Sequence, residues 1–184
     1  MRHPMFALCT LALLSAGQAA EPFVLKSPDF PDQGSLSATH MLNGFGCTGA
    51  NRSPALEWSN PPPGTKSFAL LVHDPDAPTG GSGLWHWVVI DIPAASRQLP
   101  AGAGQAQGAA LPAGAVQWNT DFGAPGWGGP CPPVGHRPHH YHFTLHALKV
   151  DKLELPANGS AALVGYMVNA NSLGQATLTG TFGR

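Results

Sequence analysis

The sequence predicts a mainly β fold, a β-sandwich with one or two short helices. Three observations support this fold class. The 184 residues include 23 glycines and 19 prolines, which interrupt long helices and favour turns. Six short segments are rich in β-branched, aromatic or alternating apolar residues, and Gly or Pro bounds them. Only one further segment has a pattern typical of a helix, so most of the chain is expected to form short strands joined by turns.

The expected strands are, in chain order, Phe23–Lys26, Ala55–Trp58, Ser67–His73, Leu84–Ile92, Tyr141–Leu148 and Gln175–Phe182. Two stretches within them, Ser67–Val72 and Trp87–Ile92, are almost continuously apolar, which is typical of strands covered on both faces. We expect these two strands at the centre of the fold. Between strands, Ala101–Ala115 has no period and almost no bulky residue, so it is predicted to be a surface loop.

A helix is expected near the end of the chain, over Ala157–Val168. Asn158 or Ser160 offers an N-cap, because short polar side chains accept hydrogen bonds from the free N–H groups of a first helical turn. Leu163 and Met167 are four residues apart and share one face of such a helix.

Residues 1–20 are predicted to be a secretory signal peptide that is cleaved after Ala19 or Ala20. Arg2 precedes the apolar run Phe6–Ser15, and small residues follow it. The run is shorter than the roughly 20 apolar residues that a membrane-spanning helix needs. We expect an exported protein, periplasmic or secreted, with no transmembrane segment and with residues 21–184 as a single domain.

Cleavage would remove Cys9 and leave Cys47 and Cys131 in the mature chain. An even pair of cysteines in an exported protein is a candidate disulfide. The sequence does not show whether their Cα atoms lie within the roughly 7 Å that a disulfide requires, so the pairing stays open at this point.

Low charge excludes two classes of protein. Only 10% of the residues are charged, and the formal net charge is -1. A nucleic-acid-binding protein needs a basic surface that neutralises phosphates, and a disordered chain is usually highly charged. We therefore expect a folded domain that does not bind nucleic acid.

The first candidate site is His73-Asp74-Pro75-Asp76-Ala77-Pro78, which is followed by Trp85-His86-Trp87. One interpretation is purely structural, since Asp and Pro in this order form a turn. His86 favours a site, because strict strand alternation puts it on one face with Val88, Ile90 and Ile92 and directs it to the core or to a cavity. A buried imidazole needs a partner, which Asp74 or Asp76 would supply.

The second candidate site is the His-rich segment 136–146. Alternation along a strand puts His139, Tyr141, Phe143 and Leu145 on one face, and the apolar members predict that this face turns inward. The other face, with His140, His142, Thr144 and His146, is expected to meet solvent or a shallow groove.

A metal site is an alternative interpretation of the same segment. His140 and His142 have the i, i+2 spacing of a strand-borne metal pair, and Cys131 or His136 would add ligands. A solvated polar face explains the same residues and is preferred, because no Cys-x-x-Cys or His-Glu-x-x-His motif accompanies them. We expect no metal and no cofactor. No phosphate loop or Gly-x-Ser-x-Gly elbow stands in a suitable context either, so we expect a protein that is not an enzyme and has no catalytic residue.

Several motifs together resemble the phosphatidylethanolamine-binding protein family, in its bacterial Raf-kinase-inhibitor-like branch. They cover nearly the whole mature chain and occur in the family's order. These motifs are Phe45–Pro54, Ala55–Trp58, Asp74–Pro78, Trp85–Val89, Gly129–Pro133, His139–Tyr141 and Leu178–Phe182.

The resemblance implies an antiparallel β fold with Greek-key connections and a small pocket for phosphate-like anions or phospholipid head groups. By position, the pocket residues are Asp74, Asp76, His86, Gly129, Pro132 with Pro133, His139 and Tyr141. In this interpretation His86 and His139 donate to anion oxygens, Tyr141 adds a hydroxyl donor, and Gly129 permits close approach. Asp74 would orient one of the histidines.

The chain departs from the family pattern at His140, where many relatives have Arg, and at Leu84, where several bacterial relatives have Trp. Two functions follow as expectations. The first is a binding or regulatory protein whose partner is a small anionic ligand or a phospholipid head group. The alternative is a protein–protein interaction module, such as a protease inhibitor, whose pocket anchors a protein partner.

Overall fold

The computed structural model describes residues 21–105 and 107–184. The expected signal peptide lies outside the described residues. The described chain folds around one large sheet with the strand order β2-β11-β10-β6-β7-β9. Its strands are β2 (Gly34–Ser35), β6 (Ser67–Asp74), β7 (Leu84–Pro93), β9 (Val116–Gln117), β10 (His139–Leu148) and β11 (Ser172–Phe182). All neighbours in this sheet are antiparallel except β2, which runs parallel to β11.

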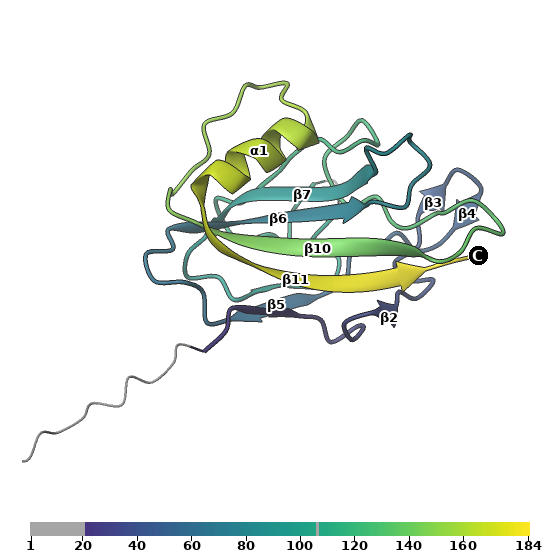
Figure 1. Cartoon of the computed structure of the whole chain (residues 1–184), viewed down its shortest axis with the longest axis horizontal. Helices are drawn as coiled ribbons and strands as arrows, with labels where there is room; N and C mark the ends of the chain where they lie inside the picture. Colours follow the sequence, from purple (N-terminus) through teal and green to yellow (C-terminus); the bar gives the residue numbers. More distant parts are fainter. Residues whose placement is uncertain (1–20, 106) are drawn as a thin grey trace, which may run out of the picture.

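Each face of the large sheet is covered by a different layer, as Figure 1 shows. One face packs against a small sheet of order β1-β5-β8, made of β1 (Val24–Lys26), β5 (Leu56–Ser59) and β8 (Gln98–Leu99). The main core lies between these two sheets and includes Trp58, Phe68, Trp87 and Phe143. The other face is covered by the helix α1 (Ala161–Asn171), which closes a second, smaller core.

The predicted mainly β sandwich and its six principal strands are confirmed, with boundaries that shift by at most three residues. The prediction missed the short strands β2, β8, β9 and a hairpin of β3 (Asn43–Gly44) and β4 (Cys47–Thr48). Each of these has two residues, which is too short for any alternating pattern to be visible. The central position predicted for Ser67–Val72 and Trp87–Ile92 is confirmed for β6 and holds for β7, which has only the short β9 outside it.

The helix exists but begins and ends a few residues later than predicted, at Ala161 and Asn171. It starts after Ser160, whose Oγ accepts a hydrogen bond from the Leu163 N–H at 3.2 Å. The buried residues are Ala161, Val164, Gly165 and Val168, whereas Leu163 and Met167 are only half-buried. Because no residue of the helix is charged, several of its faces are apolar, and the sequence alone could not select the buried one.

The prediction that His146 faces solvent or a shallow groove is wrong. His146 lies on β10 opposite Ala69 of β6, on the face that α1 covers, and only 3% of it is exposed. Burial lowers the pKa of its imidazole to about 4. Alternation identified the correct face of the strand, but it did not reveal that a helix covers this end of that face.

The segment 101–115 forms turns in its described part, 101–105 and 107–115, without strand or helix, as predicted. It is not wholly on the surface, because Ala103 is fully buried in the main core. Next to it, the Gly104 N–H donates a hydrogen bond to Ser53 Oγ. The small residues Ala103 and Gly104 therefore allow this loop to pack against the sandwich.

Candidate functional site

The candidate residues meet at one end of the large sheet. The antiparallel register brings the carboxyl end of β6, with Asp74, beside the first residues of β7 and β10. His86 lies near the start of β7, and His139 and Tyr141 lie at the start of β10. Residues far apart in the sequence are thus gathered by strand pairing alone.

A β-bulge turns His86 into this group. Val72 pairs with Trp87 and the next residue, His73, pairs with Trp85, so His86 is an extra residue in β7. Its ring is 2% exposed and meets the ring of Tyr141 edge-on, with centroids 5.1 Å apart. The prediction that His86 points inward is therefore confirmed.

The reason given for that orientation is wrong in part. Val88 and Ile90 pack in the core under α1, whereas Ile92 packs in the main core, on the side where Tyr141 also lies. The bulge at His86 and a second register shift before Ile92 reset the alternation twice. Strict alternation along β7 could not describe its two faces.

Asp74 is the centre of the buried polar group and is 3% exposed. Its Oδ2 accepts a hydrogen bond from His139 Nδ1 at 2.8 Å, and its Oδ1 accepts one from the Asp76 N–H at 2.8 Å. His86 Nε2 lies 4.0 Å from the same Oδ2. The exposed His136 contacts the other ring nitrogen of His139, with Nδ1 and Nε2 3.4 Å apart. Both ring nitrogens of His139 are therefore engaged.

Two buried polar atoms of this group, His86 Nε2 and the Tyr141 hydroxyl, have no hydrogen-bond partner among the described residues. His86 Nδ1 lies 2.6 Å from the Gly128 carbonyl oxygen, which can only accept, so the proton of a neutral His86 is on Nδ1 and its Nε2 carries a lone pair. Buried polar groups without a partner are rare in folded proteins and cost about 1–3 kcal/mol each. These two atoms are therefore the strongest sign of a ligand.

The titration behaviour of the two groups differs. Burial lowers the pKa of His86, and the charge of His73 adds to this effect, while the Gly128 carbonyl and the carboxylates of Asp74 and Asp121 oppose it. Burial raises the pKa of Tyr141 far above its usual value, and so do the charge of the Asp74 carboxylate and the interaction of the hydroxyl with it, although no hydrogen bond of regular geometry joins the two groups. The Tyr141 hydroxyl thus stays protonated and is available as a donor.

These side chains line a cavity of about 400 Å³. Of the predicted site residues, it brings together Asp74, His86, Pro132, His139 and Tyr141. The cavity lies within the 300–1,000 Å³ range that is usual for sites of organic ligands.

Asp76 and Gly129 were predicted as pocket residues, but neither belongs to the cavity wall. Asp76 accepts a hydrogen bond from the Arg137 guanidinium at its Oδ1, 2.6 Å away, and one from His140 Nδ1 at its Oδ2, also 2.6 Å away. Desolvation would raise the pKa of Asp76, but the two hydrogen bonds from His140 and the charge of Arg137 outweigh it and lower the pKa to about 2. Asp76 thus fixes the start of β10 behind the site.

Gly129 also acts outside the cavity. Its N–H donates to Asn51 Oδ1 at 2.8 Å, and a Cβ at this position would collide with the His40 carbonyl oxygen. The close approach between these two chain segments therefore requires glycine here.

The sequence missed several apolar wall residues: Leu42, Phe45, Ala77 and Phe122. Phe122 packs edge-on against His86, with ring centroids 5.2 Å apart, and its ring lies 6.3 Å from that of Phe45. Phe122 stands in an irregular segment without periodicity, so no sequence signal pointed to it. Phe45 stands in a motif that was quoted for the family resemblance but was given no role.

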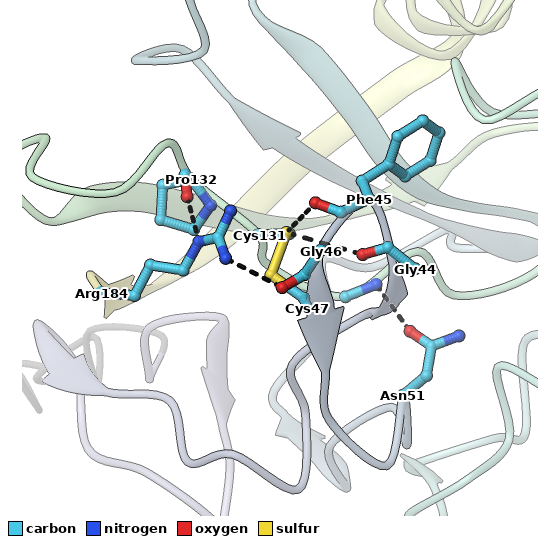
Figure 2. The surroundings of a disulfide bond; sticks show 9 residues. Gly44, Phe45, Gly46, Cys47, Asn51, Cys131, Pro132 and Arg184 are labelled. Atoms are coloured by element: carbon cyan, nitrogen blue, oxygen red, sulfur yellow. Dashed lines mark hydrogen bonds between the residues drawn. A yellow bond between two sulfur atoms is a disulfide. The ribbon is translucent and has the colours of Figure 1, made fainter.

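One wall of the cavity is fastened by a disulfide between Cys47 and Cys131, whose Cα atoms are 6.0 Å apart. Figure 2 shows that the bond joins the β3–β4 hairpin to the segment before β10. Arg184 reinforces the same junction, because its guanidinium donates to the carbonyls of Pro132 at 2.7 Å and of Gly46 at 3.1 Å. The pairing that the sequence left open is thus present in the structure.

The metal interpretation finds no support in the geometry. Cys131 is bonded to Cys47 and cannot act as a thiolate ligand. Within residues 21–105 and 107–184, no three His, Cys, Asp or Glu side chains are arranged to hold a metal ion. In the same residues, no helix is long and apolar enough to cross a membrane.

The fold and the buried group at the end of the sheet define the class of protein. The family model of the phosphatidylethanolamine-binding protein matches residues 26–183, and the chain belongs to this family. It is 50% identical over 169 residues to the UPF0098 protein YbcL of Escherichia coli K12, with 92% of each chain covered. It is 46% identical to YbhB of the same organism, over 86% of this chain and 98% of YbhB.

Solved structures agree with this assignment. The crystal structure of E. coli YbcL superimposes with a TM-score of 0.85 at 50% identity, covering 88% of this chain and 98% of that chain. The family homologue CT736 from Chlamydia trachomatis gives a TM-score of 0.73 at 27% identity, covering 88% and 97% of the two chains. The resemblance predicted from the motifs is confirmed.

Proposed function

We propose that the protein binds a small anion, such as phosphate or a phospholipid head group, in the cavity at the end of the large sheet. The observation that carries this proposal is the pair of buried atoms without partners, His86 Nε2 and the Tyr141 hydroxyl. An anion oxygen placed between them would accept one hydrogen bond from each. Binding would thereby remove the cost of two unpaired polar groups.

The donors follow from the protonation states. Tyr141 donates at any physiological pH, because its pKa is raised. Neutral His86 presents a lone pair at Nε2, so it must take up a proton before it can donate there. The Asp74 carboxylate, 4.0 Å away, favours that protonated form, and so does a bound anion. Anion binding is therefore coupled to the uptake of a proton.

This assignment changes the role expected for His139. Its Nδ1 is bonded to Asp74 and its Nε2 contacts His136, so neither nitrogen is free to donate to a ligand. In the proposed function His139 is a positioning residue that holds the Asp74 carboxylate in place. Asp74 in turn orients the His86 ring and favours its protonated form.

We further propose that the protein is exported and acts by binding rather than by catalysis. The apolar run Phe6–Ser15 and the disulfide between Cys47 and Cys131 support export, because disulfides persist in oxidising compartments. A regulatory role without a chemical step fits a site with two donors and no positioned nucleophile among the described cavity residues.

A titration with sodium phosphate, observed by NMR, tests the binding proposal. The ring signals of His86 and His139 are expected to shift, and to shift further as the pH falls from 7.5 to 5.5. His142, which lies on the opposite face of β10, serves as the internal control. Unchanged His86 signals at millimolar phosphate would contradict the proposal.

A second candidate function is a protein–protein contact at the opening of the same cavity. Phe45 is 82% exposed and lines the cavity, and Val134, next to the wall residue Pro133, is 75% exposed. Exposed apolar side chains beside a pocket are typical of protein contacts. Capture from a periplasmic extract by the wild type, lost in both Phe45→Ser and His86→Ala, would favour this function over small-ligand binding.

A further inference from the structure

We propose that the ligand is an amphiphilic monoanion, a carboxylate that carries an aromatic or branched apolar group. This inference rests on the proposed anion-binding function and adds the chemical class of the ligand. It is argued from the distribution of polar and apolar groups in the cavity, from its charges and from its size.

The cavity has a polar floor and an apolar mouth. The floor consists of Asp74, His86, His139 and Tyr141, each at most 3% exposed. The walls above it are apolar, and the side chains that reach solvent there include Phe45 at 82% exposure. A ligand that fills such a site has its charged group inside and its apolar group at the entrance.

The apolar side of the mouth is formed by residues from three separate segments: Leu42 and Phe45, Leu84, and Phe122. Phe45 and Phe122 lie against each other at an interplanar angle of 56°, and Phe122 also covers the ring of His86. Inorganic phosphate has no apolar group that could bury these walls. An apolar group attached to the anion would bury them, and that burial favours binding.

Charge argues against a dianion. Among the residues that the structure describes, no Lys or Arg lines the cavity, whereas the carboxylates of Asp74 and Asp121 do. Arg137 is bonded to Asp76, and Arg184 is bonded to backbone carbonyls outside the floor. One proton taken up by His86 balances one negative charge on the ligand. A second negative charge would face two carboxylates without a compensating cation.

Size points the same way. A cavity of about 400 Å³ is large enough for a small organic molecule, and a single inorganic anion would leave most of it to water. The two free polar atoms also suit a planar carboxylate, which has two oxygens and can accept from both.

The test compares the affinity of the purified protein for five probes at pH 7.5 by isothermal titration calorimetry. The probes are phenylacetate, acetate, phosphate, the neutral phenylacetamide and the cationic phenethylammonium. Phenylacetate is expected to bind at least about tenfold more tightly than acetate and phosphate, because burial of a ring contributes roughly tenfold to a hundredfold in affinity. It is also expected to bind at least about tenfold more tightly than phenylacetamide and phenethylammonium, which carry the same ring without a negative charge. Phosphate is mainly a dianion at this pH, so it tests the charge argument.

Two exposed residues provide a matched pair of variants that leave the core intact. Phe45→Ser is expected to weaken phenylacetate binding about fivefold or more without changing acetate binding. Val116→Ser removes an apolar side chain that is 43% exposed on β9 and does not line the cavity. It is expected to change neither affinity.

The outcomes separate this inference from the function on which it rests. If phosphate binds as tightly as phenylacetate, or if phenylacetamide or phenethylammonium does, the ligand class is wrong. If phosphate is the probe that binds as tightly, the proposed anion binding still stands. If none of the three anions binds or shifts the His86 signals, the proposed function itself fails.

Discussion

The Tyr141 hydroxyl is the group whose removal separates ligand binding from stability most clearly. Tyr141 is fully buried, and its hydroxyl has no partner among the described residues. Phenylalanine keeps the ring in place, including its edge-on contact with His86 at 5.1 Å, and removes only the unpaired oxygen. Substitution of a typical buried residue lowers the stability of the protein. Tyr141→Phe is expected not to.

The magnitude follows from the state of the hydroxyl. A buried hydroxyl without a hydrogen bond costs about 1–3 kcal/mol, so Tyr141→Phe is expected to hold the free energy of unfolding or to raise it by up to about 2 kcal/mol. A hydrogen bond to a charged acceptor contributes about 1.5–3 kcal/mol, so anion affinity should fall by roughly tenfold to a hundredfold. The same change therefore stabilises the fold and weakens binding.

Urea denaturation of the wild type and Tyr141→Phe measures the first effect, and a calorimetric titration with phenylacetate measures the second. Tyr166→Phe is the matched control, since Tyr166 is 69% exposed on α1 and is expected to change neither quantity. A loss of more than about 1 kcal/mol in Tyr141→Phe would refute the reasoning, because it would mean that the hydroxyl has a partner in the free protein.

Three further predictions concern the rest of the fold. The folded pKa of His146, about 4, lies below its ordinary value of 6.5, so its contribution to stability is full above pH 6.5 and is lost as the pH falls towards 4. His146→Leu should remove up to about 3 kcal/mol of that pH dependence, measured by urea unfolding at pH 7 and pH 4.5, and an unchanged slope would contradict the burial argument. The folded pKa of Asp76 is lowered to about 2, so its contribution is full above pH 4 and is lost between pH 4 and pH 2. Asp76→Asn should flatten thermal stability in that range, and a curve parallel to the wild type would count against this role. Cys47→Ser combined with Cys131→Ser opens a loop with a sequence separation of 84 and should cost about 4 to 5 kcal/mol in the chain-entropy model. Two reactive thiols in the unfolded, unreduced wild type would show instead that the bond is absent.

Strand positions and the inward face of β10 could be predicted from the sequence, because both depend on local patterns. The alternation of His139, Tyr141 and Phe143 with polar neighbours is visible in the chain, and all three side chains are buried as predicted. Asp74 was also expected beside a histidine. The pattern could not show which of the two histidines Asp74 binds. In the structure, Asp74 Oδ2 accepts a hydrogen bond from His139 Nδ1 at 2.8 Å.

The errors share a physical cause, which is that they depend on a second layer or on an irregular backbone. His146 is buried because α1 lies over it, and no property of β10 itself reveals this. His86 points into the site through a bulge that strict alternation excludes. Phe122 reaches the cavity from an irregular segment, and Gly129 allows close packing against residue 40, a role that the sequence did not show. Such features arise only when distant segments come together.

A crystal structure of the protein soaked with phosphate at pH 5.5 tests the central claim most directly. We predict one phosphate at the floor of the cavity, with oxygens about 2.6–3.0 Å from both the Tyr141 hydroxyl and His86 Nε2. Electron density for the anion at another site, or ordered water bonded to these two atoms at saturating phosphate, would contradict the account.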